Sequence, residues 1–219
     1  LSVKKKVKIQ SKWDLVNVGD VLFEQPKSKI KVGTAKDYIG EEYLFFTSGE
    51  SVYNYKEYLV DNQNIYLSTG GNAIVKFHDG KASYSTDTFV VKSNDETIVK
   101  TKYIFYFLES IIEMINEFYF KGLGLKHLQK PDFRSIKIPL PPIEIQEKIV
   151  VEIEGLEAKQ TKAKEEVGNL KNSIYNKFAS LPFEKQNLGN LSVFKNGLNY
   201  SRKSSGQIID IVGVKDFQD

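Results

Sequence analysis

Residues that could catalyse a reaction or hold a metal ion are few in this sequence. It contains two histidines, His78 and His127, and no cysteine. A protein zinc site takes several cysteine, histidine or acidic ligands, usually at short spacings, whereas these two histidines stand far apart. The sequence therefore predicts no metal site.

Three short patterns resemble catalytic or phosphate-binding motifs, but each lacks something that its chemistry needs. Asp132 with Glu157 and Lys159 has the acids and the lysine of a metal-dependent nuclease site. Glu157 and Lys159, however, fall in a long helical pattern, where such residues form a solvated face. The glycine-containing segments 68–72 and 122–124 lack the Lys-Ser/Thr ending of a P-loop, and the sequence has no complete dinucleotide fingerprint. We predict no catalytic residue.

Binding of a nucleic acid is the chemistry that the remaining polar residues could supply. The net charge is only +3, with 31 basic and 28 acidic side chains, but the lysines are clustered. Lysines neutralise phosphates, and short Ser, Thr and Asn side chains at turns can reach base edges where the backbone approaches DNA. The predicted DNA-binding residues are Lys27, Ser28, Lys29, Lys31, Ser48, Ser68, Thr69, Gly70, Asn72, Lys121, Gly122 and Lys126. These residue types also occur in ordinary solvated turns, so composition alone leaves both interpretations open.

The elements that would carry these residues form a mixed domain of the α+β class. Alternating apolar residues predict strands at 42–47, 64–67, 73–77, 82–85 and 88–92. The Asp79-Gly80 pair between two of these runs predicts a β-hairpin. An amphipathic helix is predicted from about residue 100 to residue 120, and its glutamates exclude it as a membrane span.

A longer helix is predicted after Pro141 and Pro142, because proline suits the first helical turn. Apolar residues then recur at alternating steps of four and three, as they do on the pairing face of a coiled coil. The residues of this pairing face are Ile149, Ile153, Leu156, Gln160, Ala163, Val167, Leu170 and Ile174. Such a face requires a partner helix, and at 1.5 Å per residue the helix would extend roughly 55 Å.

The polar member of the pairing face, Gln160, has two interpretations that the sequence leaves open. It either fixes the register of the paired helices or occupies a tolerated, partly wet position. In both cases the pair of substitutions Ile153→Asp and Leu170→Asp is expected to abolish self-association, because unpaired charge would be buried between the helices.

A short internal similarity suggests how the chain is divided. Residues 17–21 (NVGDV) match residues 187–191 (NLGNL) in kind, and an aromatic residue precedes each by four positions. We therefore predict a DNA-reading domain at 1–138, a spacer or dimerisation helix at 139–182, and the incomplete start of a second, similar domain at 183–219.

The first residues contain no apolar segment of the kind found in signal peptides, and the absence of cysteine fits a reducing compartment. We expect a cytoplasmic protein with no membrane association. Because the chain begins at Leu1 rather than Met, we expect it to be a fragment or a trimmed form.

Residues 128–149 (LQKPDFRSIKIPLPPIEIQEKI) carry a resemblance to a known family. They resemble the junction between target-recognition domain and conserved helix in the specificity (S) subunits of type I restriction-modification systems. Trp13 followed by residues 18–21 resembles the start of a recognition domain in that family. Segments 68–71 and 84–88 resemble its central strands and turns. The similarity extends over nearly the whole chain.

The resemblance implies a subunit that recognises DNA without catalysing a reaction. In that family two recognition domains each read one half of a split site in double-stranded DNA. Two long antiparallel helices space these domains and dock the methyltransferase (M) subunits. A restriction (R) subunit completes the assembly, and S-adenosylmethionine, ATP and Mg belong to the partner subunits. This chain has one complete recognition domain, so two copies could pair through their helices as a homodimer.

Two other functions remain open from the sequence. The chain could be the C-terminal recognition part of a fused methylation-restriction enzyme, with catalytic domains before Leu1. It could also be a scaffold protein whose coiled coil is its main function and which binds no DNA. Salt-dependent DNA binding is expected of a specificity subunit and of a fused enzyme, but not of a scaffold protein.

Overall fold

The computed structural model describes residues 9–181 of the chain. The chain divides into two compact units, Leu1–Glu165 and Glu166–Asp219. The strands are β1 (Leu15–Asn17), β2 (Leu22–Glu24), β3 (Tyr43–Phe46), β4 (Val52–Tyr55), β5 (Gln63–Ser68), β6 (Val75–Asp79), β7 (Ala82–Tyr84), β8 (Thr88–Ser93), β9 (Phe120–Lys121), β10 (His127–Leu128) and β11 (Lys137–Pro139). The helices are α1 (Val18–Val21), α2 (Val32–Lys36), α3 (Thr101–Ser110), α4 (Ile112–Phe118), α5 (Lys130–Arg134) and α6 (Ile143–Ala179). The mixed α+β class predicted from the sequence is confirmed.

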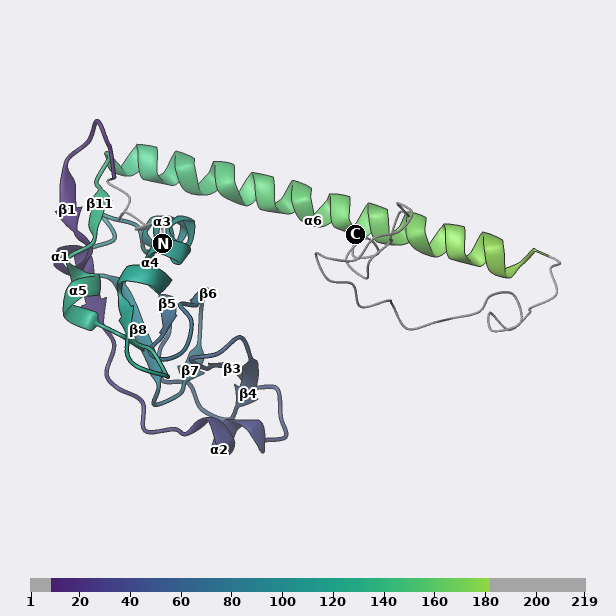
Figure 1. Ribbon diagram of the computed structural model, residues 1–219, viewed down its shortest axis with the longest axis horizontal. Helices are drawn as coiled ribbons and strands as arrows, with labels where there is room; N and C mark the ends of the chain where they lie inside the picture. The colour runs from purple at the N-terminus through teal and green to yellow at the C-terminus, as the bar shows by residue number, and fades with distance from the viewer. Residues whose placement is uncertain (1–8, 182–219) are drawn as a thin grey trace, which may run out of the picture. The chain divides into compact units, whose positions relative to one another are not determined.

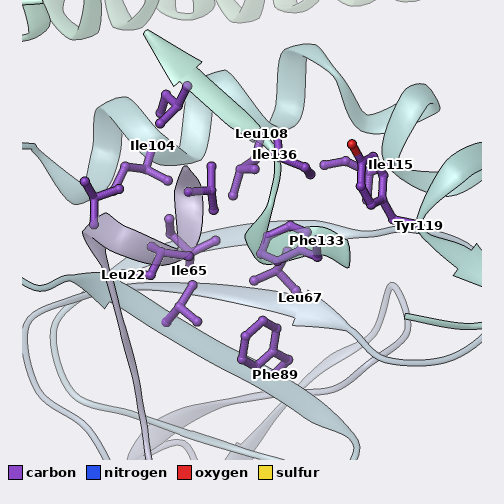
Figure 2. Packing of buried hydrophobic residues seen from close by; sticks show 14 of the residues in the cluster. Leu22, Ile65, Leu67, Phe89, Ile104, Leu108, Ile115, Tyr119, Phe133 and Ile136 are labelled. Atoms are coloured by element: carbon purple, nitrogen blue, oxygen red, sulfur yellow. The ribbon is translucent and has the colours of Figure 1, made fainter. Parts of the chain in front are cut away.

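An antiparallel sheet with strand order β2-β8-β5-β6 forms the centre of the first unit. Successive side chains of a strand point to opposite faces, so the apolar run of β5 serves two cores. Ile65 and Leu67 lie in the larger core with Phe89 of β8, between the sheet and the helices (Figure 2). Tyr66 points to the other face and joins a smaller core. Burial on both faces explains why the centre of β5, residues 65–67, is apolar without alternation.

Each face of the central sheet is covered by a different layer. Helices α3, α4 and α5 contribute Ile104, Leu108, Ile115 and Phe133 to the larger core on one face (Figure 2). On the opposite face lies a second sheet of order β4-β3-β7, in which β3 and β7 are parallel. The ring of Phe46 from β3 stacks on the ring of Tyr66 with 4.0 Å between centroids.

Two predictions of local structure are wrong, although the predicted strands correspond to β3, β5, β6, β7 and β8. The Asp79-Gly80 turn does not close a hairpin, because β6 pairs with β5 and β7 pairs with β3 in the other sheet. The single helix predicted at 100–120 is two helices that meet at Ile111. The hydroxyl of Ser110 donates to the carbonyl of Phe107, and such bonding competes with a continuous helix.

Helix α6 is continuous over 37 residues, as the sequence predicted (Figure 1). Its first turns belong to the first unit, since Glu147 pairs with Lys100 at 2.9 Å and Glu157 accepts a hydrogen bond from Tyr106 at 2.8 Å. The compact unit therefore reaches Glu165, beyond the boundary predicted at residue 138. The segment 183–219, including the second copy of the short internal similarity, lies outside the described residues.

One residue assigned to the pairing face needs correction. Ile149 packs against the larger core of its own domain, and the side chain of Ile153 is also partly covered. The later residues of the pairing face, from Leu156 to Ile174, are exposed along the described part of α6. The exposed part of the pairing face thus begins at Leu156.

Candidate nucleic-acid interface

One end of the central sheet gathers the segments that the sequence analysis selected. At this end Ser68 of β5 pairs with Thr88 of β8. The turn after β5 is held from two sides, because the amide of Thr69 donates to Ser48 Oγ at 2.9 Å and the amide of Gly71 donates to the carbonyl of Lys126 at 2.9 Å. We call this end, formed by segments 25–31, 47–51, 68–74, 85–88 and 121–130, the loop end of the sheet.

The lysine-rich segment before α2 reaches the same loop end. The amide of Thr86 donates to the carbonyl of Ile30 at 2.9 Å, and the hydroxyl of Tyr84 donates to the carbonyl of Pro26 at 2.5 Å. The four predicted groups of site residues, far apart in the sequence, are therefore neighbours in space. Their role in binding DNA stays a prediction.

Two serines predicted to contact DNA are instead used inside the domain. Ser68 is buried, and its Oγ donates to the carbonyl of Asn72 at 2.7 Å and accepts from the amide of Ile74 at 2.9 Å. Ser28 is also buried, and its Oγ accepts from the amide of Ile30 at 3.0 Å. Both hydroxyls stabilise turns, as Ser often does, and neither is available to a ligand.

The lysines of the loop end differ in whether an acidic side chain already pairs with them. Lys27, Lys29, Lys31 and Lys126 have exposed side chains. Lys121 also lies on the surface, where its ammonium pairs with Asp132 at 2.6 Å. An exposed ion pair of this kind contributes little to stability and can exchange its partner for a phosphate.

The predicted DNA-binding residues do not include two cations of α5 near this end, Lys130 and Arg134. Both pair with the carboxylate of Glu24 at 2.6 Å, and the Lys130 ammonium lies 4.1 Å from the centroid of the Phe89 ring. Lys130 also lines a shallow hollow of about 270 Å³ together with Lys27 and Thr69. Their spacing of four residues would have indicated one helical face, had the short helix α5 been recognised.

The opposite end of the sheet has a different electrostatic character. A hollow of about 460 Å³ there is lined by Asn62, Gln63, Asp79, Lys92, Ser93 and Glu96. Its carboxylates would repel a phosphate backbone, whereas the loop end presents several free lysines. The charge distribution of the described domain thus favours the loop end as the surface for an anionic polymer.

A partly buried lysine holds the turn that carries Ser48. The ammonium of Lys76 on β6 donates to the carbonyls of Thr47 at 3.2 Å and of Gly49. Desolvation lowers the pKa of Lys76, although the nearby Glu50 opposes this effect. Ser48 in turn holds Thr69, so Lys76 supports the loop end without being exposed at it.

Replacing Lys76 with methionine should loosen this turn. The carbonyls of residues 47–51 would lose their charged donor, and we expect the free energy of unfolding to fall by about 1 kcal/mol. Urea denaturation measures the loss, and faster amide hydrogen exchange in residues 47–51 locates it. Lys36→Met, at an exposed lysine of α2, is the matched control and should change neither. Equal stability of the two variants would contradict a supporting role for Lys76.

The two histidines do not form a site with each other. His78 on β6 lies beside the Phe46 ring, and His127 on β10 lies next to Gly70 at the loop end. Within residues 9–181 no group of three or more histidine and acidic side chains has the arrangement of a metal site. None of the helices described is long and apolar enough to span a bilayer.

A layered α+β domain with a basic end, continued by one long helix, has the architecture of a DNA-specificity domain. A family model described as "Type I restriction modification DNA specificity domain" matches residues 10–172. The chain therefore belongs to this family, and the resemblance noted in the sequence is confirmed.

Individual relatives agree with this assignment. The chain is 28% identical over 152 residues to the type I restriction enzyme MjaVIII specificity subunit of Methanocaldococcus jannaschii, covering 65% of this chain and 35% of that protein. It is 26% identical over 159 residues to the type I restriction enzyme EcoDI specificity subunit of Escherichia coli, and this match covers 72% of this chain and 34% of that protein. The chain thus spans about a third of the length of these relatives.

Solved structures share the fold at low sequence identity. The type I S subunit from M. genitalium superposes with a TM-score of 0.58 at 14% identity, covering 73% of this chain and 43% of that one. The HsdS subunit from Thermoanaerobacter tengcongensis gives a TM-score of 0.50 at 15% identity, and the match covers 73% of this chain and 40% of that one. At these identities the likeness concerns the fold.

Proposed function

We propose that this chain is a sequence-specific DNA-binding specificity subunit that reads one half of a bipartite site in double-stranded DNA. The convergence of free lysines, the exposed Asn72 and glycine turns on the loop end is the observation that carries this proposal. Membership in the DNA-specificity family supports it independently. Lys27, Lys29, Lys31 and Lys126 neutralise phosphates and hold the domain in register on the duplex.

Base recognition falls to the short polar groups between these lysines. Asn72 has an exposed side chain in the turn after β5, and asparagine forms a paired hydrogen bond to adenine in the major groove. Thr69 and Gly70 let the backbone of the same turn approach the bases. Ser48 positions this turn by accepting a hydrogen bond from the amide of Thr69. The lysines therefore supply affinity and this turn supplies specificity.

Helix α6 provides the second half of the function. Its exposed pairing face binds an antiparallel long helix, either from a second copy of this chain or from the remainder of a longer one. The paired helices separate two recognition domains and dock the methyltransferase subunits, with which a restriction subunit assembles. Catalysis takes place in these cytoplasmic partners, which bind S-adenosylmethionine, ATP and Mg, and this chain supplies no catalytic group.

Mapping of methylated bases tests the proposal most directly. The chain is expressed with its methyltransferase in a host that lacks this modification, and the genome is sequenced for methylated adenines. A split motif that appears only when the chain is present supports the proposal, and a palindromic motif indicates two identical copies. No new methylation, together with no DNA binding by the assembled complex at low salt, would contradict it and favour a scaffold.

The phosphate contacts make a separate prediction. Lys27→Ala combined with Lys126→Ala should weaken binding to all duplexes alike and should reduce the slope of log K against log salt by about two. The slope falls because two fewer counterions are released. Fluorescence anisotropy with labelled duplexes at several salt concentrations measures it. Lys92→Ala, at the acidic end of the sheet, is the control. The same slope in all three proteins would mean that DNA does not contact the loop end.

A further inference from the structure

The tip of the loop between β9 and β10 carries two leucines that the proposed function does not yet use. Leu123 is 106% exposed and Leu125 is 64% exposed. Single exposed leucines are common on protein surfaces and need no explanation. These two differ because they sit together at the tip of a loop whose base is fixed and lies at the loop end.

The base of this loop is firmly held. Phe120 pairs with Leu128 between β9 and β10, and both side chains are buried in the larger core. The amide of Leu128 donates to the carbonyl of Thr69 at 3.0 Å, which ties the loop to the turn after β5. The tip therefore projects from a rigid base.

Glycines give the tip its shape. Gly122 has φ +152° and Gly124 has φ +89°, conformations that other residues rarely adopt. A Cβ atom on Gly122 would lie 2.6 Å from the carbonyl oxygen of Leu125, so a larger residue would force the backbone to move. The leucines are thus presented by a specific turn with lysines at positions 121 and 126 on either side.

We propose that Leu123 inserts as a wedge between adjacent base pairs of the bound duplex, with Leu125 packed beside it. This inference rests on the proposed function. Proteins that unstack a base step use an apolar side chain flanked by basic residues, and they kink the duplex toward the major groove. Two leucines are too small for a specific protein interface, which buries about 800 Å² per partner, whereas one side chain is enough for a wedge. The kink selects half-sites that contain an easily unstacked step.

Fluorescence of 2-aminopurine tests the wedge. The complex of this chain with its methyltransferase is bound to duplexes that carry the mapped site, with 2-aminopurine placed at successive positions of the half-site. We expect increased fluorescence at one step besides the target adenine, which the methyltransferase flips out. Leu123→Ala should remove the signal at that step, leave the flipping signal, and weaken binding about tenfold. Gly122→Ala, which keeps both leucines but distorts the tip, should also remove it.

Ile98→Ala provides the control, because Ile98 is an exposed aliphatic residue before α3, away from the loop end. An unchanged fluorescence profile and affinity in Leu123→Ala would overturn the wedge, while salt-dependent binding would leave the proposed function intact. Loss of methyltransferase binding without any change at the DNA step would also overturn it, since the tip would then be a protein contact. If no duplex binds at any salt concentration, the proposed function and the wedge both fail.

Discussion

Replacing Gln146 with leucine should lower the free energy of unfolding of the recognition domain by roughly 3 kcal/mol. Gln146 lies in the first turns of α6 and is completely buried. Its Oε1 accepts from the amide of Lys100 at 2.9 Å, and its Nε2 donates to the carbonyls of Ile98 and Pro141, also at 2.9 Å. Leucine has a similar volume but no polar atoms, so the buried carbonyl of Pro141 and two partly buried backbone groups would lose their partners.

The same three bonds join the segment before α3 to the entry of α6. Ile98 and Lys100 precede α3, and Pro141 lies two residues before the start of α6. Gln146 therefore sets how the first turns of α6 attach to the α+β domain. We expect Gln146→Leu to reduce methylation of the split site by more than its loss of stability accounts for.

Urea denaturation followed by circular dichroism measures the stability change, and methylation is compared below the temperature at which the variant begins to unfold. The matched control is Asn172→Leu, which replaces another side-chain amide with leucine at an exposed position of the same helix, outside the pairing face. It should change the stability by no more than about 0.5 kcal/mol. A Gln146→Leu protein as stable as the control would show that these backbone groups find other partners.

Strands and helices of the domain were predictable from the sequence where a short run of neighbouring residues determines them. Alternation of apolar residues located β3, β5, β6, β7 and β8, and the proline entry located α6. The Asp79-Gly80 turn shows where such signals fail. Its residues favour a turn, but they do not say that β7 pairs with β3, in parallel and from the other sheet. Strand pairing depends on distant segments, which no short pattern contains.

The candidate site also contains residues that the sequence could predict and residues that it could not. Residue type correctly selected the segments that meet at the loop end, because lysine, serine and glycine at turns are visible in any sequence. It could not distinguish Ser68, whose hydroxyl is used inside a turn, from Asn72, whose side chain is exposed. Lys130 and Arg134 were not selected as site residues, because α5 is a single short turn whose periodicity does not show that they share a face. Gln146 was visible only as part of a family pattern, and its bonds explain why glutamine is needed there.

Replacing Val167 and Leu170 with aspartate should abolish pairing of α6 with a partner helix. Both residues lie on the pairing face, and their side chains are 50% and 64% exposed. A long helix with an exposed apolar stripe and interior glycines at 155 and 168 gains little stability by itself, so it depends on a partner. Two aspartates per helix would place four unpaired charges in the paired interface, and we expect self-association to weaken more than 100-fold. Val167 serves this test better than the half-buried Ile153, whose substitution would also affect the domain.

Sedimentation velocity of the 219-residue chain over a range of concentrations measures this pairing. Asn169→Asp with Asn172→Asp is the matched control, because it adds the same charge at the same spacing on the outer side of the helix. The control should associate as the wild type does, and only the Val167→Asp, Leu170→Asp protein should sediment as a monomer at every concentration. Loss of methylation in that protein alone would connect helix pairing to the reading of a split site. If both variants remained paired, the apolar stripe of α6 would not be the surface that joins two recognition domains.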